Sequence, residues 1–288
     1  MPIRILCLHG RGSNTEIFRM QTAGIRSLLE PEYEFVFVEG RWPHLEGNWS
    51  LHTVDFSKSN LYGFYNMLDI DDILATENEL RQVIEDHGPF DGLLGYSQGG
   101  SMAAQIAMRL LIENPYATLP ELPIKFLVLI NSAVPPLIMP LDEQQVTELP
   151  IEEAPKLRML FDVFKADPAE HLDKARPVKL ANGRQVIITA TGKALCFAYN
   201  ASPPPALVNK THYMTFFDKA WDGHPLSMPS LHVTGQGDAP EYGQQLYDIA
   251  EPGQAELIRH VFGHDFPRGL DVNKTIARSI RALAEKAL

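Results

Sequence analysis

The chain has 288 residues, of which 45% are hydrophobic, and its formal net charge at pH 7 is −11. The length suffices for one large α/β domain or two small ones. An acidic chain with scattered Arg and Lys excludes a nucleic-acid partner, because it repels phosphates. The two cysteines, Cys7 and Cys196, cannot build a disulfide framework.

No apolar stretch approaches the roughly 18 residues that a membrane span needs. The N-terminal apolar run is too short for a signal peptide and no small-residue cleavage site follows it. We therefore expect a cytoplasmic protein with no membrane span.

Strand-like runs alternate with helical patterns along the chain. The run at 124–130, IKFLVLI, is apolar throughout, as a parallel strand buried on both faces requires. Further strands are predicted at 3–8, 34–40, 91–97, 230–235 and 255–262. Helical periodicity indicates helices at 69–88, 99–113 and 271–288. The alternation predicts an α/β fold whose mostly parallel sheet carries helices on both faces.

The segment 135–227 departs from this pattern, because prolines interrupt it in AVPPLIMP, LPIEEAP and ASPPPALV. Within it, the stretch 184–200 is interpreted as a hairpin that turns at Thr191-Gly192. We expect one domain over residues 1–288, with 135–227 as a lid-like insertion over one edge of the sheet.

The stretch DGLLGYSQGGSMAAQ places the pattern Gly-x-Ser-x-Gly, residues 95–99, between a predicted strand and a predicted helix. A nucleophilic serine needs this context, since a strained turn exposes its hydroxyl. Gly95 and Gly99 leave room where the strand and the helix approach each other closely. The alternative is a bystander serine in a glycine-rich loop. The flanking elements favour Ser97 as a nucleophile.

A nucleophilic serine also needs a base and a carboxylate that orients the base. Asp238 and His264 each follow a predicted strand, in the order serine, acid, histidine. We therefore predict both at the carboxyl edge of the sheet. His260 is a poorer base because it lies inside a strand, and Glu241 and Asp265 are the alternative acids.

An oxyanion hole would complete such a site. One donor is predicted to be the backbone N–H of Gln98, and the other that of Arg11, with Gly12 as the alternative. His9 is interpreted as shaping this loop, because no other ligand lies at a spacing typical of zinc. We expect no metal and no organic cofactor.

Large apolar side chains could wall a cleft above the serine. The candidates for this substrate pocket are Trp42, Phe64, Phe197 and Trp221. Such a cleft selects an acyl chain or an aromatic polyketide over a sugar or a peptide. The alternative interpretation is that many of these side chains pack against the sheet.

The stretches LCLHGRGSN, GYSQGG, SLHVTGQGD and GHDFPR occur in this order. With them, the sequence resembles the fungal serine hydrolase (FSH) family of α/β-hydrolases over residues 3–134 and 228–285. The resemblance implies an α/β-hydrolase fold and a catalytic triad of Ser97, Asp238 and His264. The sequence departs from the family in its long segment 135–227 and in Gly-His-Asp where Gly-Gly-His is usual.

The resemblance implies a serine hydrolase that cleaves a small-molecule acyl ester or thioester through an acyl-enzyme. Many relatives release a polyketide from a carrier protein in secondary-metabolite pathways, so an acyl carrier protein of a polyketide synthase is a candidate partner. The alternatives are a general carboxylesterase without such a partner, or a hydrolase scaffold repurposed for binding or cyclisation.

Overall fold

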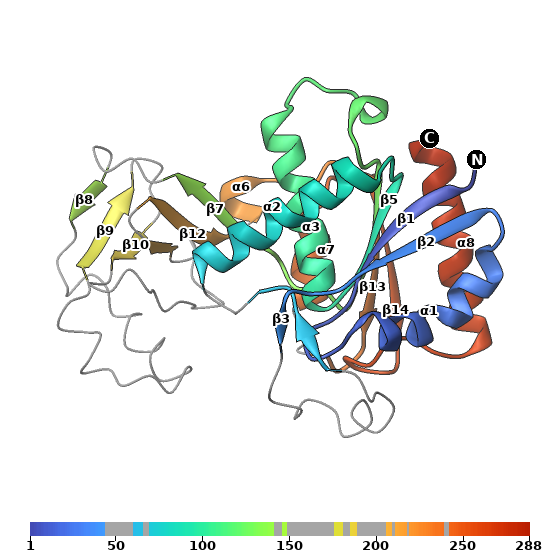
Figure 1. The fold of residues 1–288 in the computed structure, drawn as a ribbon. Helices are drawn as coiled ribbons and strands as arrows, with labels where there is room; N and C mark the ends of the chain where they lie inside the picture. The colour runs from blue at the N-terminus through green and yellow to red at the C-terminus, as the bar shows by residue number, and fades with distance from the viewer. Residues whose placement is uncertain are drawn as a thin grey trace. The chain divides into compact units, whose positions relative to one another are not determined.

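The computed structural model describes residues 1–43, 60–65, 69–140, 211–217, 219–238 and 242–288, together with four strands at 146–148, 176–180, 185–188 and 206–208 (Figure 1). The chain divides into two compact units. The first comprises Met1–Tyr65, Ala75–Pro135 and His224–Leu288, and the second comprises Asn66–Leu74 and Pro136–Gly223.

A six-stranded sheet forms the centre of the first unit. Its order is β14-β13-β6-β5-β1-β2, and every neighbouring pair is parallel. The strands are β1 (Ile3–Leu8), β2 (Tyr33–Val38), β5 (Gly92–Tyr96), β6 (Phe126–Ile130), β13 (Ser230–Gly235) and β14 (Ala255–His260). All six predicted strands are confirmed, and β6 is buried along its whole length.

Helices cover both faces of this sheet (Figure 1). On one face lie α1 (Thr15–Leu29) and α8 (Leu270–Ala287), which contact each other. On the other, α3 (Gln98–Glu113) packs against β1, β5 and β6. The arrangement confirms the predicted α/β fold with helices on both faces.

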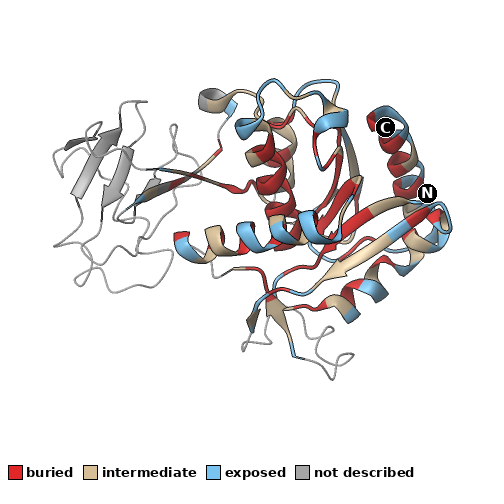
Figure 2. Ribbon diagram, turned by 45° about the horizontal axis from the view of Figure 1, so that its top comes forward, coloured by how far each residue is buried: buried red, intermediate tan, exposed pale blue. Residues whose placement is uncertain are grey.

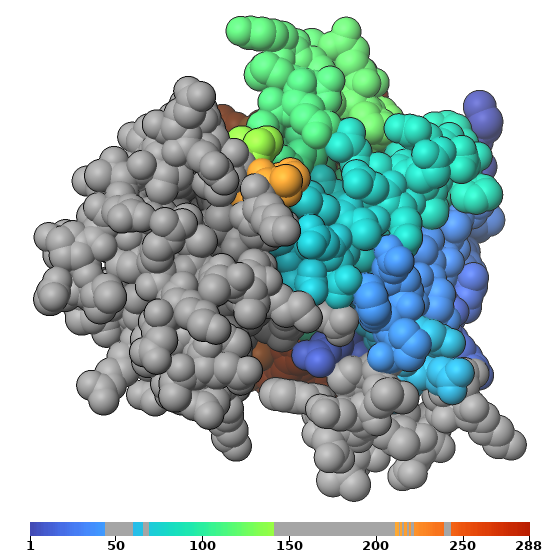
Figure 3. All heavy atoms as spheres, turned by 60° about the vertical axis from the view of Figure 1, so that its left-hand side comes forward, coloured from blue at the N-terminus to red at the C-terminus, as the bar shows by residue number. Residues whose placement is uncertain are grey.

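Two ion pairs join α3 to α2 (Ile70–His87). Arg109 contacts Glu77 at 3.0 Å, and Arg81 contacts Glu113 at 2.8 Å. On the face seen in Figure 3, α2 (cyan) and the end of α3 (green) form adjoining parts of the surface. The helix at residues 69–88 predicted from periodicity is thus confirmed and is tied to the helix that follows the serine.

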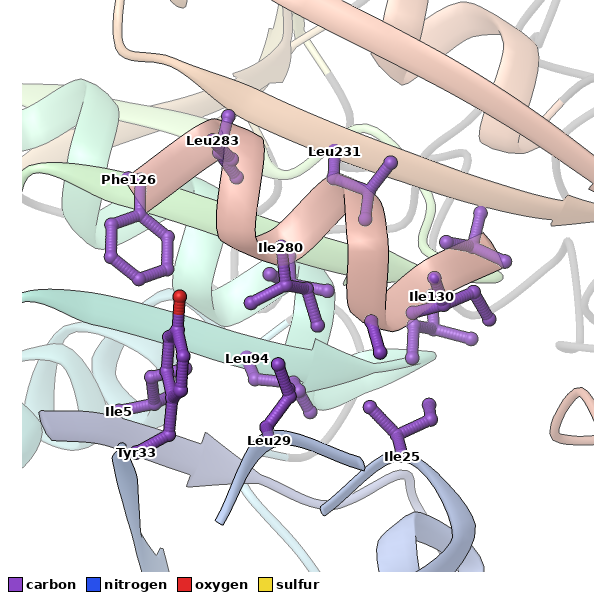
Figure 4. Close-up of a cluster of buried hydrophobic side chains, with 14 of the residues drawn as sticks. Ile5, Ile25, Leu29, Tyr33, Leu94, Phe126, Ile130, Leu231, Ile280 and Leu283 are labelled. Carbon is purple, nitrogen blue, oxygen red and sulfur yellow. The ribbon is translucent and has the colours of Figure 1, made fainter. Parts of the chain in front are cut away.

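The hydrophobic core fills the space between the sheet and the helices α1 and α8. Ile25 and Leu29 of α1 and Ile280 of α8 are fully buried against Leu94 and Leu231 of the sheet (Figure 4). Burial of each such side chain contributes about 1.5–3 kcal/mol. Buried residues accordingly gather in the central strands β5 and β6 and in the first part of α3, where Gln98–Met108 are all buried (Figure 2).

Shorter elements complete the first unit. Its two-stranded ribbon pairs β3 (Trp42–Pro43) with β4 (Tyr62–Gly63) in antiparallel register. The described residues of this unit also form a 3₁₀ turn at Leu119–Glu121 and the helix α7 (Tyr242–Asp248) beside β13. No helix in the described part of the chain is both long and apolar enough to cross a membrane.

The second unit holds a mixed six-stranded sheet of order β7-β12-β11-β10-β9-β8 and the helix α6 (Lys219–Asp222). Its strands are β7 (Pro136–Pro140), β8 (Val146–Glu148), β9 (Arg176–Leu180), β10 (Gln185–Ile188), β11 (Ala206–Val208) and β12 (His212–Phe216). The hairpin predicted within 184–200 is wrong. Both edges of β10 pair with strands outside that stretch, β9 and β11, which leaves no edge for a local partner.

Candidate active site

Ser97 lies in a sharp turn between β5 and α3. Its backbone has φ 52° and ψ −119°, a conformation that side-chain-bearing residues rarely adopt. The turn is fixed by the Ser97 N–H, which donates to the carbonyl of Ile130 at 2.9 Å. A Cβ at Gly95 would overlap Gly100, and one at Gly99 would overlap the carbonyls of Leu8 and His9. Both glycines are therefore required where predicted.

The structure brings Ser97, His264 and Asp238 together. His264 Nε2 lies 3.0 Å from Ser97 Oγ, and His264 Nδ1 lies 3.0 and 2.9 Å from the two carboxylate oxygens of Asp238. The three residues follow β5, β14 and β13 respectively. They meet because the carboxyl ends of parallel strands share one edge of the sheet.

The hydrogen bonds of His264 indicate which nitrogen carries the proton. An ionised carboxylate only accepts hydrogen bonds, so Nδ1–H donates to Asp238 and Nε2 is left to accept from the Ser97 hydroxyl. The Asp238 side chain is 12% exposed, whereas that of His264 is 51% exposed. The carboxylate is thus shielded, while the imidazole is half-exposed to solvent.

The alternative residues lie elsewhere or have other partners. His260 is buried, and burial lowers its pKa while the nearby charge of Asp238 opposes the shift. Its Nε2 lies 3.1 Å from Asn131 Oδ1. Asp265 pairs with Arg268 at 3.2 Å, and Glu241 lies outside the described residues.

The predicted oxyanion donors come from two segments beside the serine. Gln98 is the first residue of α3, and Arg11 lies in the loop after β1, where a Cβ at Gly10 would come within 3.4 Å of Ser97 Cβ. The N–H of Gly12, the alternative donor, is already taken up by the carbonyl of Tyr62 at 2.9 Å. Within the described residues, no hydrogen bond engages the backbone N–H of Gln98 or of Arg11.

The side chain of Gln98 has a function that the sequence does not indicate. Its Oε1 accepts a hydrogen bond from the Phe64 N–H at 2.9 Å, and its Nε2 donates to the Tyr65 carbonyl at 2.8 Å. Tyr62, two residues before Phe64, exchanges backbone hydrogen bonds with Ser13 of the loop after β1. Segment 62–65 therefore links Gln98, the residue after Ser97, to the loop that carries Arg11.

The predicted pocket residues are only partly placed. Trp42 is half-buried in β3, and its indole Nε1 is buried. Phe64 is 1% exposed, and the centroid of its ring lies 4.9 Å from that of the His9 ring, so Phe64 packs against the start of the loop after β1. Phe197 and the side chain of Trp221 lie outside what the structure describes.

His9 has the structural role that we predict. The residue is fully buried, its Nδ1 lies 2.7 Å from the Gly10 carbonyl, and its Nε2 accepts from the Gly40 N–H at 2.9 Å. It thereby fixes the loop after β1 against the end of β2. Among the described residues, no group of three or more His, Cys, Asp or Glu side chains is arranged to hold a metal ion.

One buried residue beside the site was not predicted from the sequence. Asn131 directly follows β6 and contacts both the segment before Asp238 and the segment around His264. Its only sequence signal is a residue type that tolerates positive φ at the end of a buried strand.

Comparison with known proteins finds relatives that are named as hydrolases and esterases. Hydrolase phiM of Talaromyces stipitatus is 33% identical over 178 residues, which are 58% of this chain and 69% of that protein. Hydrolase FUB4 of Fusarium oxysporum is 25% identical over 269 residues, 92% of each chain. Esterase alnB of Emericella nidulans is 24% identical over 286 residues, 94% of this chain and 92% of that one.

Solved structures agree on the fold. A variant of SOBER1 from Arabidopsis thaliana matches with a TM-score of 0.50 and 13% identity, over 98% of this chain and 99% of that one. The chain thus has an α/β-hydrolase fold, as predicted. The model of the serine hydrolase (FSH1) family matches residues 1–276, and the chain therefore belongs to the FSH1 family of serine hydrolases.

Proposed function

We propose that the protein hydrolyses an acyl ester or acyl thioester through a covalent acyl-enzyme on Ser97. The observation that carries the proposal is the hydrogen-bonded series Ser97 Oγ, His264 Nε2, His264 Nδ1 and Asp238, with contacts of 2.9 to 3.0 Å. The serine, its base and the group that orients the base are thus each within reach of the next.

In the acylation half, His264 Nε2 takes the proton of Ser97 while Oγ attacks the carbonyl carbon. The oxyanion that forms is stabilised by the backbone N–H groups of Gln98 and Arg11. The tetrahedral intermediate collapses by breaking the bond to the leaving group, which departs as an alcohol or thiol with the proton from His264. Asp238 stabilises the imidazolium between these two transfers.

In the deacylation half, His264 takes a proton from water, and the resulting hydroxide oxygen attacks the acyl carbon. The second intermediate releases Ser97 Oγ, which regains the proton from His264, and the product leaves as a carboxylic acid. The exposed face of His264 is where this water would approach.

We infer that the preferred substrate is an apolar acyl chain, with a polyketide released from a carrier protein as the finer form of the proposal. An apolar acyl group would suit a cleft walled by the candidates Trp42, Phe197 and Trp221, since burial of each methylene of the acyl chain contributes about 0.8 kcal/mol. The relatives named as esterases favour a second candidate, a carboxylesterase without a carrier partner. The segment 135–227 is proposed as a lid.

Two measurements test these proposals. A fluorophosphonate probe should label the wild type and fail to label Ser97→Ala, and an unlabelled wild type would contradict the acyl-enzyme. Steady-state kcat/KM on oxygen esters and thioesters with matched acyl chains then separates the candidates. A clear preference for thioesters supports carrier release, and a preference for oxygen esters supports the carboxylesterase.

A further inference from the structure

We propose that Asn131 is a positioning residue for the reaction, because its amide joins the loop that carries His264 to the segment that carries Asp238. This inference rests on the proposed function. Asn131 is 2% exposed and directly follows β6, the strand between β5 and β13 in the sheet. It therefore lies between the strand that leads to the nucleophile and the strand that leads to the acid.

The nitrogen of the Asn131 amide holds the histidine loop. Nδ2 donates toward three consecutive carbonyls, those of Gly263, His264 and Asp265, at 3.3, 3.0 and 3.0 Å. An amide NH₂ has two hydrogens, so the three carbonyls share them. The contact acts on the backbone of His264 rather than on its imidazole.

The oxygen of the same amide holds the acid segment. Asn131 Oδ1 accepts from the N–H of Gly235, the last residue of β13, at 2.9 Å. It also accepts from His260 Nε2 at 3.1 Å, because His260 Nδ1 accepts from the Phe262 N–H and so leaves the proton on Nε2. Donors on one side and carbonyls on the other permit only one orientation of the amide.

The backbone places the two segments in direct contact. A Cβ at Gly235 would overlap the carbonyl of Gly263, so the end of β13 and the histidine loop touch main chain to main chain. The backbone N–H of Asn131 donates to the Val233 carbonyl at 2.8 Å, which fixes the residue to the strand before Asp238. Its φ of 47° is tolerated by Asn, Asp and Gly.

This geometry matters because the imidazole of His264 is half-exposed, so the protein surrounds it on only part of its surface. Its place between Asp238 and Ser97 depends on the backbone that carries it. A misplacement of about 1 Å at a reacting group can cost about 10²-fold in rate. Asn131 thus sets the alignment of the base without touching substrate or reacting atoms.

The test compares Asn131→Asp and Asn131→Gly, both compatible with the positive φ. Asp keeps the acceptor oxygen and points a second oxygen at three carbonyls, while Gly removes the side chain only. With p-nitrophenyl butyrate as the probe, and with rates divided by the folded fraction, kcat should fall about 10²-fold in Asn131→Asp. It should fall at least tenfold in Asn131→Gly, with KM within about twofold in both.

The matched control is Gln105→Glu, which makes the same change from amide to carboxylate at a buried site. Gln105 Nε2 donates to Glu77 at 2.7 Å, far along α3 from Ser97. This variant should lose stability and keep its kcat per folded molecule.

A wild-type kcat per folded molecule in Asn131→Gly overturns the inference, as does a fall that Gln105→Glu reproduces. Asn131→Gly carries the test alone if Asn131→Asp does not fold. A wild type whose turnover does not depend on Ser97 overturns the proposed function, and this inference with it. Ser97-dependent turnover with an unaffected Asn131→Gly overturns this inference alone.

Discussion

Tyr96 donates a hydrogen bond from its phenol to the backbone carbonyl of His264 at 2.6 Å, although the two residues are 168 positions apart in the chain. Burial, with the negative charges of Asp265 and Asp238, raises the pKa of Tyr96, so the hydroxyl stays protonated and donates. Tyr96, the residue before Ser97, thereby holds the backbone of His264 in place.

Removal of this hydroxyl in Tyr96→Phe should cost about 1 kcal/mol of unfolding free energy. The cost is modest because the His264 carbonyl keeps its contact with Asn131. We expect turnover per folded molecule to fall by about three- to tenfold, since the His264 carbonyl loses the donor Tyr96 and keeps only Asn131. Urea unfolding and esterase kinetics measure the two effects. Tyr33→Phe in β2 is the control, and an equal fall in its turnover would contradict the prediction.

The strained turn at Ser97 should reveal itself in a pair of inactive variants. Glycine adopts a φ of 52° without the penalty that a Cβ brings. Ser97→Gly should therefore be more stable than Ser97→Ala by about 1 kcal/mol, after the greater chain entropy of unfolded glycine is subtracted. The control is Ser101, which lies inside α3. There the alanine variant should be more stable than the glycine variant, because alanine favours a helix. The same order at both sites would contradict stored strain at Ser97.

The two hydrogen bonds from the Gln98 side chain to segment 62–65 predict a double effect of Gln98→Met. The substitution leaves the buried Phe64 N–H without its acceptor, which should cost about 1–3 kcal/mol. Turnover should also fall, because segment 62–65 supports the loop that carries Arg11. Denaturant unfolding and kcat measure these changes. The control is Gln82→Met on the exposed face of α2, which should change the unfolding free energy by less than about 0.5 kcal/mol. If Gln98→Met changed stability and kcat no more than this control, the proposed link would be refuted.

His232 predicts a loss of stability at acid pH. Burial lowers its pKa to about 3, so the folded protein keeps the ring neutral at pH values where the unfolded chain protonates it. The contribution of His232 to the unfolding free energy is fully present above about pH 6.5. It falls as the pH is lowered toward 3, because in that window the unfolded state binds more protons than the folded state. Between pH 7 and pH 5 the loss is about 2 kcal/mol.

The variant His232→Gln keeps a polar side chain beside Ser230, whose hydroxyl lies 3.0 Å from the imidazole Nε2. The difference in unfolding free energy between wild type and variant should shrink by about 2 kcal/mol from pH 7 to pH 5. A difference that stays constant over this range would show that His232 does not titrate as described.

Local patterns were enough to predict the sheet of the first unit and the order of its strands along the chain. A continuous apolar run such as that at 126–130 is typical of a strand in a parallel sheet that is covered on both faces. Ser97, Asp238 and His264 could be placed at one edge because each follows such a run directly. We predicted no element at 15–29, and α1 is an addition from the structure.

The contacts that hold the site could not be predicted, because they join residues distant in the chain. The amide of Asn131 contacts residues more than 100 positions away, and no local pattern marks its partners. The wrong hairpin at 184–200 has a similar cause: a turn signal at Thr191-Gly192 suggests a local partner, whereas β10 pairs with β9 and β11. Which of the near and distant strands pair depends on side-chain packing across the whole sheet, which a local stretch of sequence does not contain.

The strands β6 and β13 are hydrogen-bonded neighbours, with Leu127 opposite Ser230 and Ile130 opposite Val233, yet the unit at Pro136–Gly223 is inserted between them in sequence. Closing a loop costs only about 0.6 kcal/mol more for each doubling of its length. Segments of very different size can therefore occupy this position at nearly equal cost to the sheet. Evolution can therefore exchange or resize the inserted segment while the edge of the sheet that carries Ser97, Asp238 and His264 keeps its geometry.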